Sequence, residues 1–127
     1  MRGGLIGAMT EGEMKRRTKD FSLRILQLVE DLPETRTARI IANQLARAGT
    51  SVATNYRAVC RAKSSADMVA KVTTVEEEAD ECAFWLELLS EAGLMAATQT
   101  GALLQEAGEL TAIMVASRKT LLARIRK

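Results

Sequence analysis

Apolar residues recur at alternating steps of three and four along most of the chain, a spacing that places them on one face of a helix. The pattern predicts four helices, at about residues 11–32, 35–61, 65–92 and 101–126. The repeating positions are, in chain order, Met14, Thr18, Phe21, Ile25, Leu28 and Leu32; Ala38, Ile41, Leu45, Ala48, Val52, Asn55 and Val59; Met68, Val72, Val75, Ala79, Cys82, Leu86 and Leu89; and Leu103, Ala107, Leu110, Met114, Ser117 and Leu121.

Residues that start and stop helices lie at the ends of these segments. The first segment begins near Thr10, and Pro33 ends it because proline disfavours helical geometry at the residue before it. The turn at residues 63–67 contains serines that can cap the third helix. Gly93 is the expected left-handed residue after that helix. The first two links are therefore short, and the third, at residues 94–100, is only modestly longer.

Short links force consecutive helices to run antiparallel. The expected fold is an all-α, up-down-up-down left-handed four-helix bundle formed by residues 10–127. Residues 1–9 are expected to be a flexible N-terminal lead. They carry one charge and too short an apolar run for a secretory signal. No stretch approaches the roughly 20 apolar residues of a membrane-spanning helix, so we expect a cytoplasmic protein without membrane contact.

Composition narrows the chemistry. The 127 residues include no histidine, which excludes Ser-His-Asp and Cys-His nucleophiles, zincin sites and the Glu-x-x-His pairs of di-iron bundles. Cys60 and Cys82 lie 22 residues apart, without metal-ligand spacing, and are expected to be buried thiols. We therefore expect no enzyme activity, no cofactor and no metal.

The net charge of +2 hides a sorting of charge by end. In an antiparallel bundle, four stretches meet at one end: the start of the first helix, the end of the second, the start of the third and the end of the fourth. These stretches hold 13 of the 18 Lys and Arg residues. Twelve of the 16 acidic residues, Glu106 and Glu109 among them, fall in the middle or toward the other end. A dense positive end attracts phosphate backbones, although each cation could instead complement a helix dipole and keep the surface soluble.

The expected nucleic-acid-binding residues belong to this positive end. They are Arg57, Arg61, Lys63, Lys71, Arg118, Arg124 and Arg126. Aromatic residues, on which single-strand binders stack bases, are scarce, and Tyr56 alone lies nearby. Contacts to the nucleic-acid backbone are expected, without sequence recognition.

Two polar positions are expected to be structural. Asn55 occupies an apolar repeat position, where a buried amide often fixes helix register or oligomeric state. Folding the second and third helices back on each other places Arg47 level with Glu78 and Asp80, and either carboxylate could form an ion pair with it.

An acidic run and a set of large apolar residues on the third helix are candidates for contacts between subunits. Residues 76–81 hold five carboxylates, which repel one another at i,i+4 spacing. Arginines of the second helix, arginines of another subunit or a divalent cation could neutralise them, and we favour another subunit. Phe84, Trp85 and Leu88 flank the apolar repeat, and such surplus side chains often mark interfaces.

Two blocks of the sequence resemble the bacterial four-helix-bundle family of 23S rRNA intervening-sequence proteins, which is related to the accessory variability determinant of diversity-generating retroelements. One block runs from Ala42 to Ala62 (ANQLARAGTSVATNYRAVCRA), and the other combines residues 75–81 (VEEEADE) with residues 84–89 (FWLELL). The resemblance implies a helical bundle, ring-like homo-oligomers that are often pentameric, and no known catalysis. For the retroelement relatives it implies binding of nucleic acid and of a reverse transcriptase.

Together these features favour a non-enzymatic, oligomeric bundle, with a pentamer favoured, whose basic end binds RNA or DNA phosphates. A role as an accessory factor is one option for such a bundle. The alternative is a protein-interaction scaffold that docks a partner, such as a reverse transcriptase, through its acidic and aromatic surface.

Overall fold

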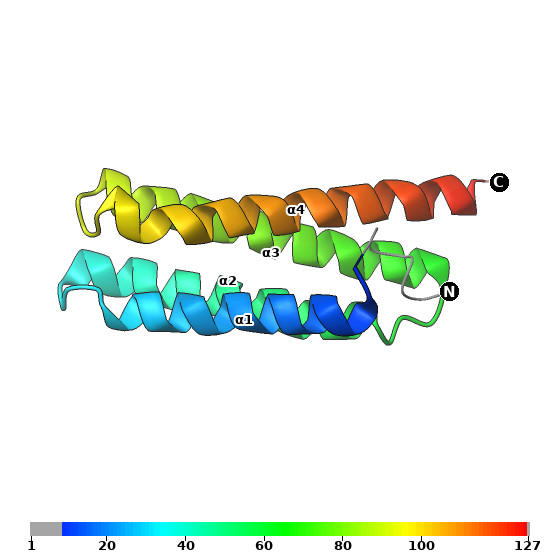
Figure 1. The fold of residues 1–127 in the computed structure, drawn as a ribbon, viewed down its shortest axis with the longest axis horizontal. Helices are drawn as coiled ribbons and strands as arrows, with labels where there is room; N and C mark the ends of the chain where they lie inside the picture. The colour runs from blue at the N-terminus through cyan, green and yellow to red at the C-terminus, as the bar shows by residue number, and fades with distance from the viewer. Residues whose placement is uncertain (1–8, 127) are drawn as a thin grey trace.

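A computed structural model describes residues 9–126 of the chain. It contains helix α1 from Glu11 to Glu30, α2 from Arg36 to Val59, α3 from Ser65 to Glu91 and α4 from Ala97 to Ile125. Consecutive helices run antiparallel (Figure 1) and form the all-α four-helix bundle that the sequence predicts. Most of the expected N-terminal lead lies outside the described residues. No helix within residues 9–126 is both long and apolar enough to cross a membrane.

Side-chain caps explain where the first three helices begin. Thr10 accepts a hydrogen bond from the backbone N–H of Glu13, whose carboxylate in turn accepts one from the N–H of Thr10. Thr35 and Ser64 cap α2 and α3 through one contact each: the hydroxyl oxygen accepts a hydrogen bond from the backbone N–H of Ala38 and of Asp67, respectively. Each cap satisfies a backbone donor that the first turn of a helix leaves unpaired.

The link between α3 and α4 is shorter than expected. Gly93 has a φ of +71°, the left-handed conformation expected of it after α3. Helix α4 then begins at Ala97, four residues before the expected position 101. Gln99 accepts a hydrogen bond from the N–H of Ala96, and the side chain of Thr100 is buried, so this stretch already packs as part of the helix.

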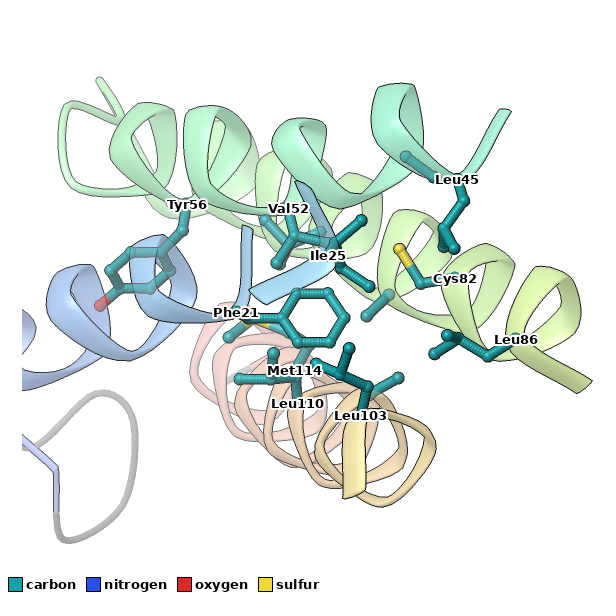
Figure 2. Packing of buried hydrophobic residues seen from close by; sticks show 14 of the residues in the cluster. Phe21, Ile25, Leu45, Val52, Tyr56, Cys82, Leu86, Leu103, Leu110 and Met114 are labelled. Atoms are coloured by element: carbon teal, nitrogen blue, oxygen red, sulfur yellow. The ribbon is translucent and has the colours of Figure 1, made fainter. Parts of the chain in front are cut away.

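The core runs along the axis of the bundle and draws residues from all four helices. Figure 2 shows Phe21, Val52, Cys82 and Leu110 converging within it. Almost every apolar repeat position from the sequence is buried there. Burial of this apolar surface is the main force that holds the helices together.

Three repeat positions are only half-buried: Leu32 and Met68, which still pack against the core, and Asn55. Asn55 is half-buried rather than part of the core, and its side-chain amide donates to the carbonyl of Ser51 in its own helix at 2.8 Å. The neighbouring Tyr56 is 1% exposed and lies in the core instead. The prediction of a core asparagine is therefore wrong. A phenol ring buries more apolar surface than an amide does, and position 56, next to position 55, also faces the core.

Helices α1 and α2 approach closely at Gly49. The hydroxyl of Ser22 donates to the carbonyl oxygen of Gly49 at 2.6 Å. A Cβ atom added at Gly49 would lie 2.8 Å from Cγ2 and 3.0 Å from Cβ of Ile25. The absence of a side chain at Gly49 is thus what allows the two backbones to come this near.

Candidate functional site

One end of the bundle carries a set of exposed cations without ion pairs. The start of α1, the end of α2, the start of α3 and the end of α4 all lie there, as the antiparallel topology requires (Figure 1). We call this set the free cations; none forms an ion pair with any residue from 9 to 126. Its members are Lys15, Arg16, Lys19, Arg57, Arg61, Lys63, Lys119, Arg124 and Arg126.

Five of the seven residues expected to bind nucleic acid belong to the free cations, and two do not. Lys71 Nζ lies 2.6 Å from Asp67 Oδ1, and Arg118 Nε lies 2.8 Å from Glu76 Oε1. The hydrogen bond from Lys71 is the largest of several contacts that lower the pKa of Asp67. Since each cation already has an anionic partner, Lys71 and Arg118 contribute less to the positive field than the sequence suggests.

Arg17 joins the basic and acidic parts of the molecule, which the sequence places at different ends. Its guanidinium donates to both carboxylate oxygens of Glu106, at 2.7 and 2.8 Å, and to Glu109 at 2.7 Å. This bidentate contact links α1 to α4 and is stronger than a single ion pair. Glu106 and Glu109 therefore lie level with the first half of α1, so the expected separation of charges is incomplete.

The predicted contact between Arg47 and Glu78 is confirmed, at 3.3 Å between Nη1 and Oε1. The second partner of Arg47 is Glu81 and not Asp80, whose side chain is exposed on another face of α3. Hydrogen bonds from Trp85 and from Arg47 hold the pKa of Glu81 below its usual value. The indole N–H of Trp85 reaches the same carboxylate at 3.0 Å.

Arginines of the same chain neutralise most of the acidic run at residues 76–81. This corrects the expectation that another subunit supplies the neutralising charges. Glu78 and Glu81 bind Arg47 of α2, and Glu76 binds Arg118 of α4. Three of the five carboxylates are therefore paired without any second chain. The side chains of the other two, Glu77 and Asp80, are exposed.

The three candidate interface residues differ in exposure. Phe84 is 53% exposed, whereas Trp85 and Leu88 are half-buried and pack against the core. The rings of Phe84 and Trp85 meet edge to face, with centroids 5.0 Å apart. Phe84 is thus the member of the set that a second molecule could cover.

The weakly acidic groups near the core are held in their protonated forms. Burial raises the pKa of Cys82 to about 12 and also raises the pKa of Tyr56 and of Cys60. Both cysteines are free thiols, and Cys82 is buried as expected, whereas Cys60 is only half-buried. No three His, Cys, Asp or Glu side chains within residues 9–126 are grouped so that they could hold a metal ion. The free cations are therefore the most distinctive chemical feature of the surface.

Comparison with known proteins places the chain in a family. Residues 10–116 match the family described as 23S rRNA-intervening sequence protein. A crystal structure of a protein of unknown function from the S23 ribosomal protein family of Bacteroides thetaiotaomicron is similar, with a TM-score of 0.78 and 27% sequence identity over 84% of this chain and 98% of that one. No curated protein matches the chain. The chain belongs to the family of 23S rRNA-intervening sequence proteins.

Proposed function

We propose that this protein is a non-enzymatic bundle that binds the phosphate backbone of RNA or DNA through its basic end. The observation that carries the proposal is the set of nine free cations gathered around one end of the molecule. Unpaired and exposed Lys and Arg side chains are the groups that displace counterions from nucleic acid, which is the main source of sequence-independent affinity.

Backbone binding fits this surface better than base recognition. Tyr56, the aromatic residue nearest the basic end in the sequence, is 1% exposed and cannot stack on a base. The described part of the basic end thus offers charge without an exposed stacking platform. Affinity for all sequences should therefore be similar.

Removing two free cations tests the proposal. The double variant Arg61→Gln/Lys63→Gln alters exposed side chains around the turn between α2 and α3, so folding should be unaffected. We expect wild-type protein to bind labelled RNA or DNA with a Kd of roughly 1–100 μM at about 50 mM salt, and the variant to bind about tenfold more weakly. Fluorescence anisotropy measures both constants.

The matched control is Arg36→Gln/Arg39→Gln, which removes the same charge from exposed positions at the opposite end. The control should retain wild-type affinity, because Arg36 and Arg39 are separated from the basic end by well over the distance at which salt screens a charge. Absence of binding by the wild-type protein at low salt, or equal losses in the two variants, would reject the proposal.

We also propose that the chain acts as a homo-oligomer, with a ring of five subunits favoured. Phe84 of α3 and Ile40 of α2 are 53% and 58% exposed, which is high for large apolar side chains and is typical of interface residues. A ring of subunits would place several basic ends near one another and strengthen their combined field.

Light scattering tests self-association directly. We expect the wild-type mass to be a multiple of the chain mass of 13.8 kDa, and Phe84→Ser to reduce it. Ser has the polarity of a solvent-facing residue, so the variant should keep the helical circular dichroism spectrum of the bundle. A wild-type mass of one chain across the micromolar range would contradict this proposal and leave nucleic-acid binding to be judged separately.

A further inference from the structure

A groove of about 590 Å³ lies between α1 and α2, lined by residues from the start of α1 and the end of α2, which belong to the basic end. Its lining on α1 extends from Gly12 to Leu23, about 16 Å at 1.5 Å per residue. Its lining on α2 extends from Thr50 to Arg57. The complete lining is Gly12, Lys15, Arg16, Lys19, Asp20, Ser22, Leu23, Thr50, Ala53, Thr54 and Arg57.

The charges along this groove have one predominant sign. Lys15, Arg16 and Lys19 stand on α1 and Arg57 stands on α2, and all four belong to the free cations. A single carboxylate, that of Asp20, faces them. The groove therefore holds a net positive charge between two walls, an arrangement that concentrates the field acting on an anion.

The groove between α1 and α4 lacks this character. The groove of about 380 Å³ between α1 and α4 includes the carboxylates of Glu13, Asp20 and Glu106. Its Arg17 is already bound to Glu106. Its lining sets three arginines, Arg16, Arg17 and Arg24, against these three carboxylates, so its charges balance. The groove between α1 and α2, with four cations and one carboxylate, is therefore the better anion site.

The floor of the α1–α2 groove combines apolar and hydroxyl groups. Leu23 is 50% exposed and, with Ala53, provides apolar surface against which a base or sugar could rest. The hydroxyls of Thr50 and Thr54 donate to carbonyls of their own helix, at 2.8 and 3.3 Å. Their oxygen lone pairs remain able to accept a hydrogen bond, and a ribose 2′-OH is a donor that DNA lacks.

Resting on the proposed function, we infer that the α1–α2 groove holds a single strand of RNA, with its phosphates on Lys15, Lys19 and Arg57. Packed helices lie about 8–10 Å apart, and the groove between their outer faces admits one extended strand, whereas a duplex would rest on the crests of the helices. The strand leaves the groove at Arg57 and continues toward Arg61 at the end of the bundle.

The test compares two variants that remove the same charge from the same end. Lys15→Gln/Lys19→Gln changes the groove, and Arg124→Gln/Arg126→Gln changes the end of α4 outside it. All four side chains are exposed and form no ion pair with any residue from 9 to 126, so both variants should fold. Binding is measured by anisotropy with a labelled uridine 20-mer, the corresponding DNA strand and an RNA duplex, and circular dichroism checks the fold.

We expect the groove variant to lose at least tenfold in affinity for the RNA strand and the α4 variant to lose clearly less. The wild-type protein should prefer the RNA strand to the DNA strand and to the duplex. Equal losses in the two variants would show a diffuse basic surface, which overturns the groove but leaves the proposed function intact. The assignment would also be overturned if the wild-type protein bound the DNA strand as tightly as the RNA strand. It would likewise be overturned if Lys15→Gln/Lys19→Gln weakened binding of the duplex as much as binding of the RNA strand. No binding of any nucleic acid would instead remove the proposed function.

Discussion

Replacing Gly49 with alanine should lower the free energy of unfolding by about 1–3 kcal/mol, the usual effect of overpacking a well-filled core. In most helix interiors the same substitution stabilises, by roughly 0.5–1 kcal/mol, because alanine loses less conformational entropy than glycine. The sign is reversed here because the added Cβ would lie 2.8 Å from Cγ2 and 3.0 Å from Cβ of Ile25.

Ile25 cannot relieve this contact by changing rotamer. Its Cβ is fixed to the backbone of α1, and the whole side chain is 0% exposed within the core. Helices α1 and α2 must therefore separate by a few tenths of an ångström or more. That movement also lengthens the hydrogen bond from Ser22 to the carbonyl of Gly49, now 2.6 Å.

Gly108→Ala is the matched control, since Gly108 lies inside α4 with no atom within 4 Å of an added Cβ. In thermal unfolding at one protein concentration, the Tm of Gly49→Ala should be roughly 5–15 °C below that of the wild type, and the Tm of Gly108→Ala slightly above it. A Gly49→Ala protein as stable as the wild type would mean that the two helices are not packed as closely as described.

Apolar periodicity was sufficient to predict the four helices, and the short links between them predicted their antiparallel order. The repeat around Leu45, Val52 and Val59 identifies the buried face of α2 because it follows directly from the pitch of a helix. Periodicity does not distinguish Asn55 from Tyr56, since both lie near the centre of that face. The choice depends on the space that the other three helices leave, which no single segment determines.

The charged positions illustrate a second limit. Topology places Lys71, Arg118 and the free cations at one end. Asp67 and Lys71 are four residues apart in α3, a spacing from which their ion pair could have been predicted. Only the register between α3 and α4 shows that Glu76 neutralises Arg118. The contact of Arg17 with Glu106 arises because α4 has 29 residues and α1 has 20, so their ends are not level. The α1–α2 groove could not be predicted either, because its lining combines side faces of two helices.

Binding of single-stranded RNA should weaken by roughly 10²–10³-fold between about 50 and 200 mM salt if about six of the nine free cations contact phosphates. Each neutralised phosphate releases condensed counterions, and adding salt reverses that gain. The logarithm of affinity should therefore fall linearly with the logarithm of salt concentration, with a slope of about −0.7 for each contact on a single strand.

The slope counts contacts, so it separates lost phosphate contacts from a change of fold. Lys15→Gln/Lys19→Gln should make the slope less steep by about 1.4, because two contacts are lost, whereas Arg36→Gln/Arg39→Gln at the opposite end should leave it unchanged. A slope near zero in the wild-type protein would mean that the free cations do not contact phosphates, whatever the affinity. A steep slope that none of the variants alters would mean that other cations make the contacts, and that the free cations at the basic end are not the binding surface.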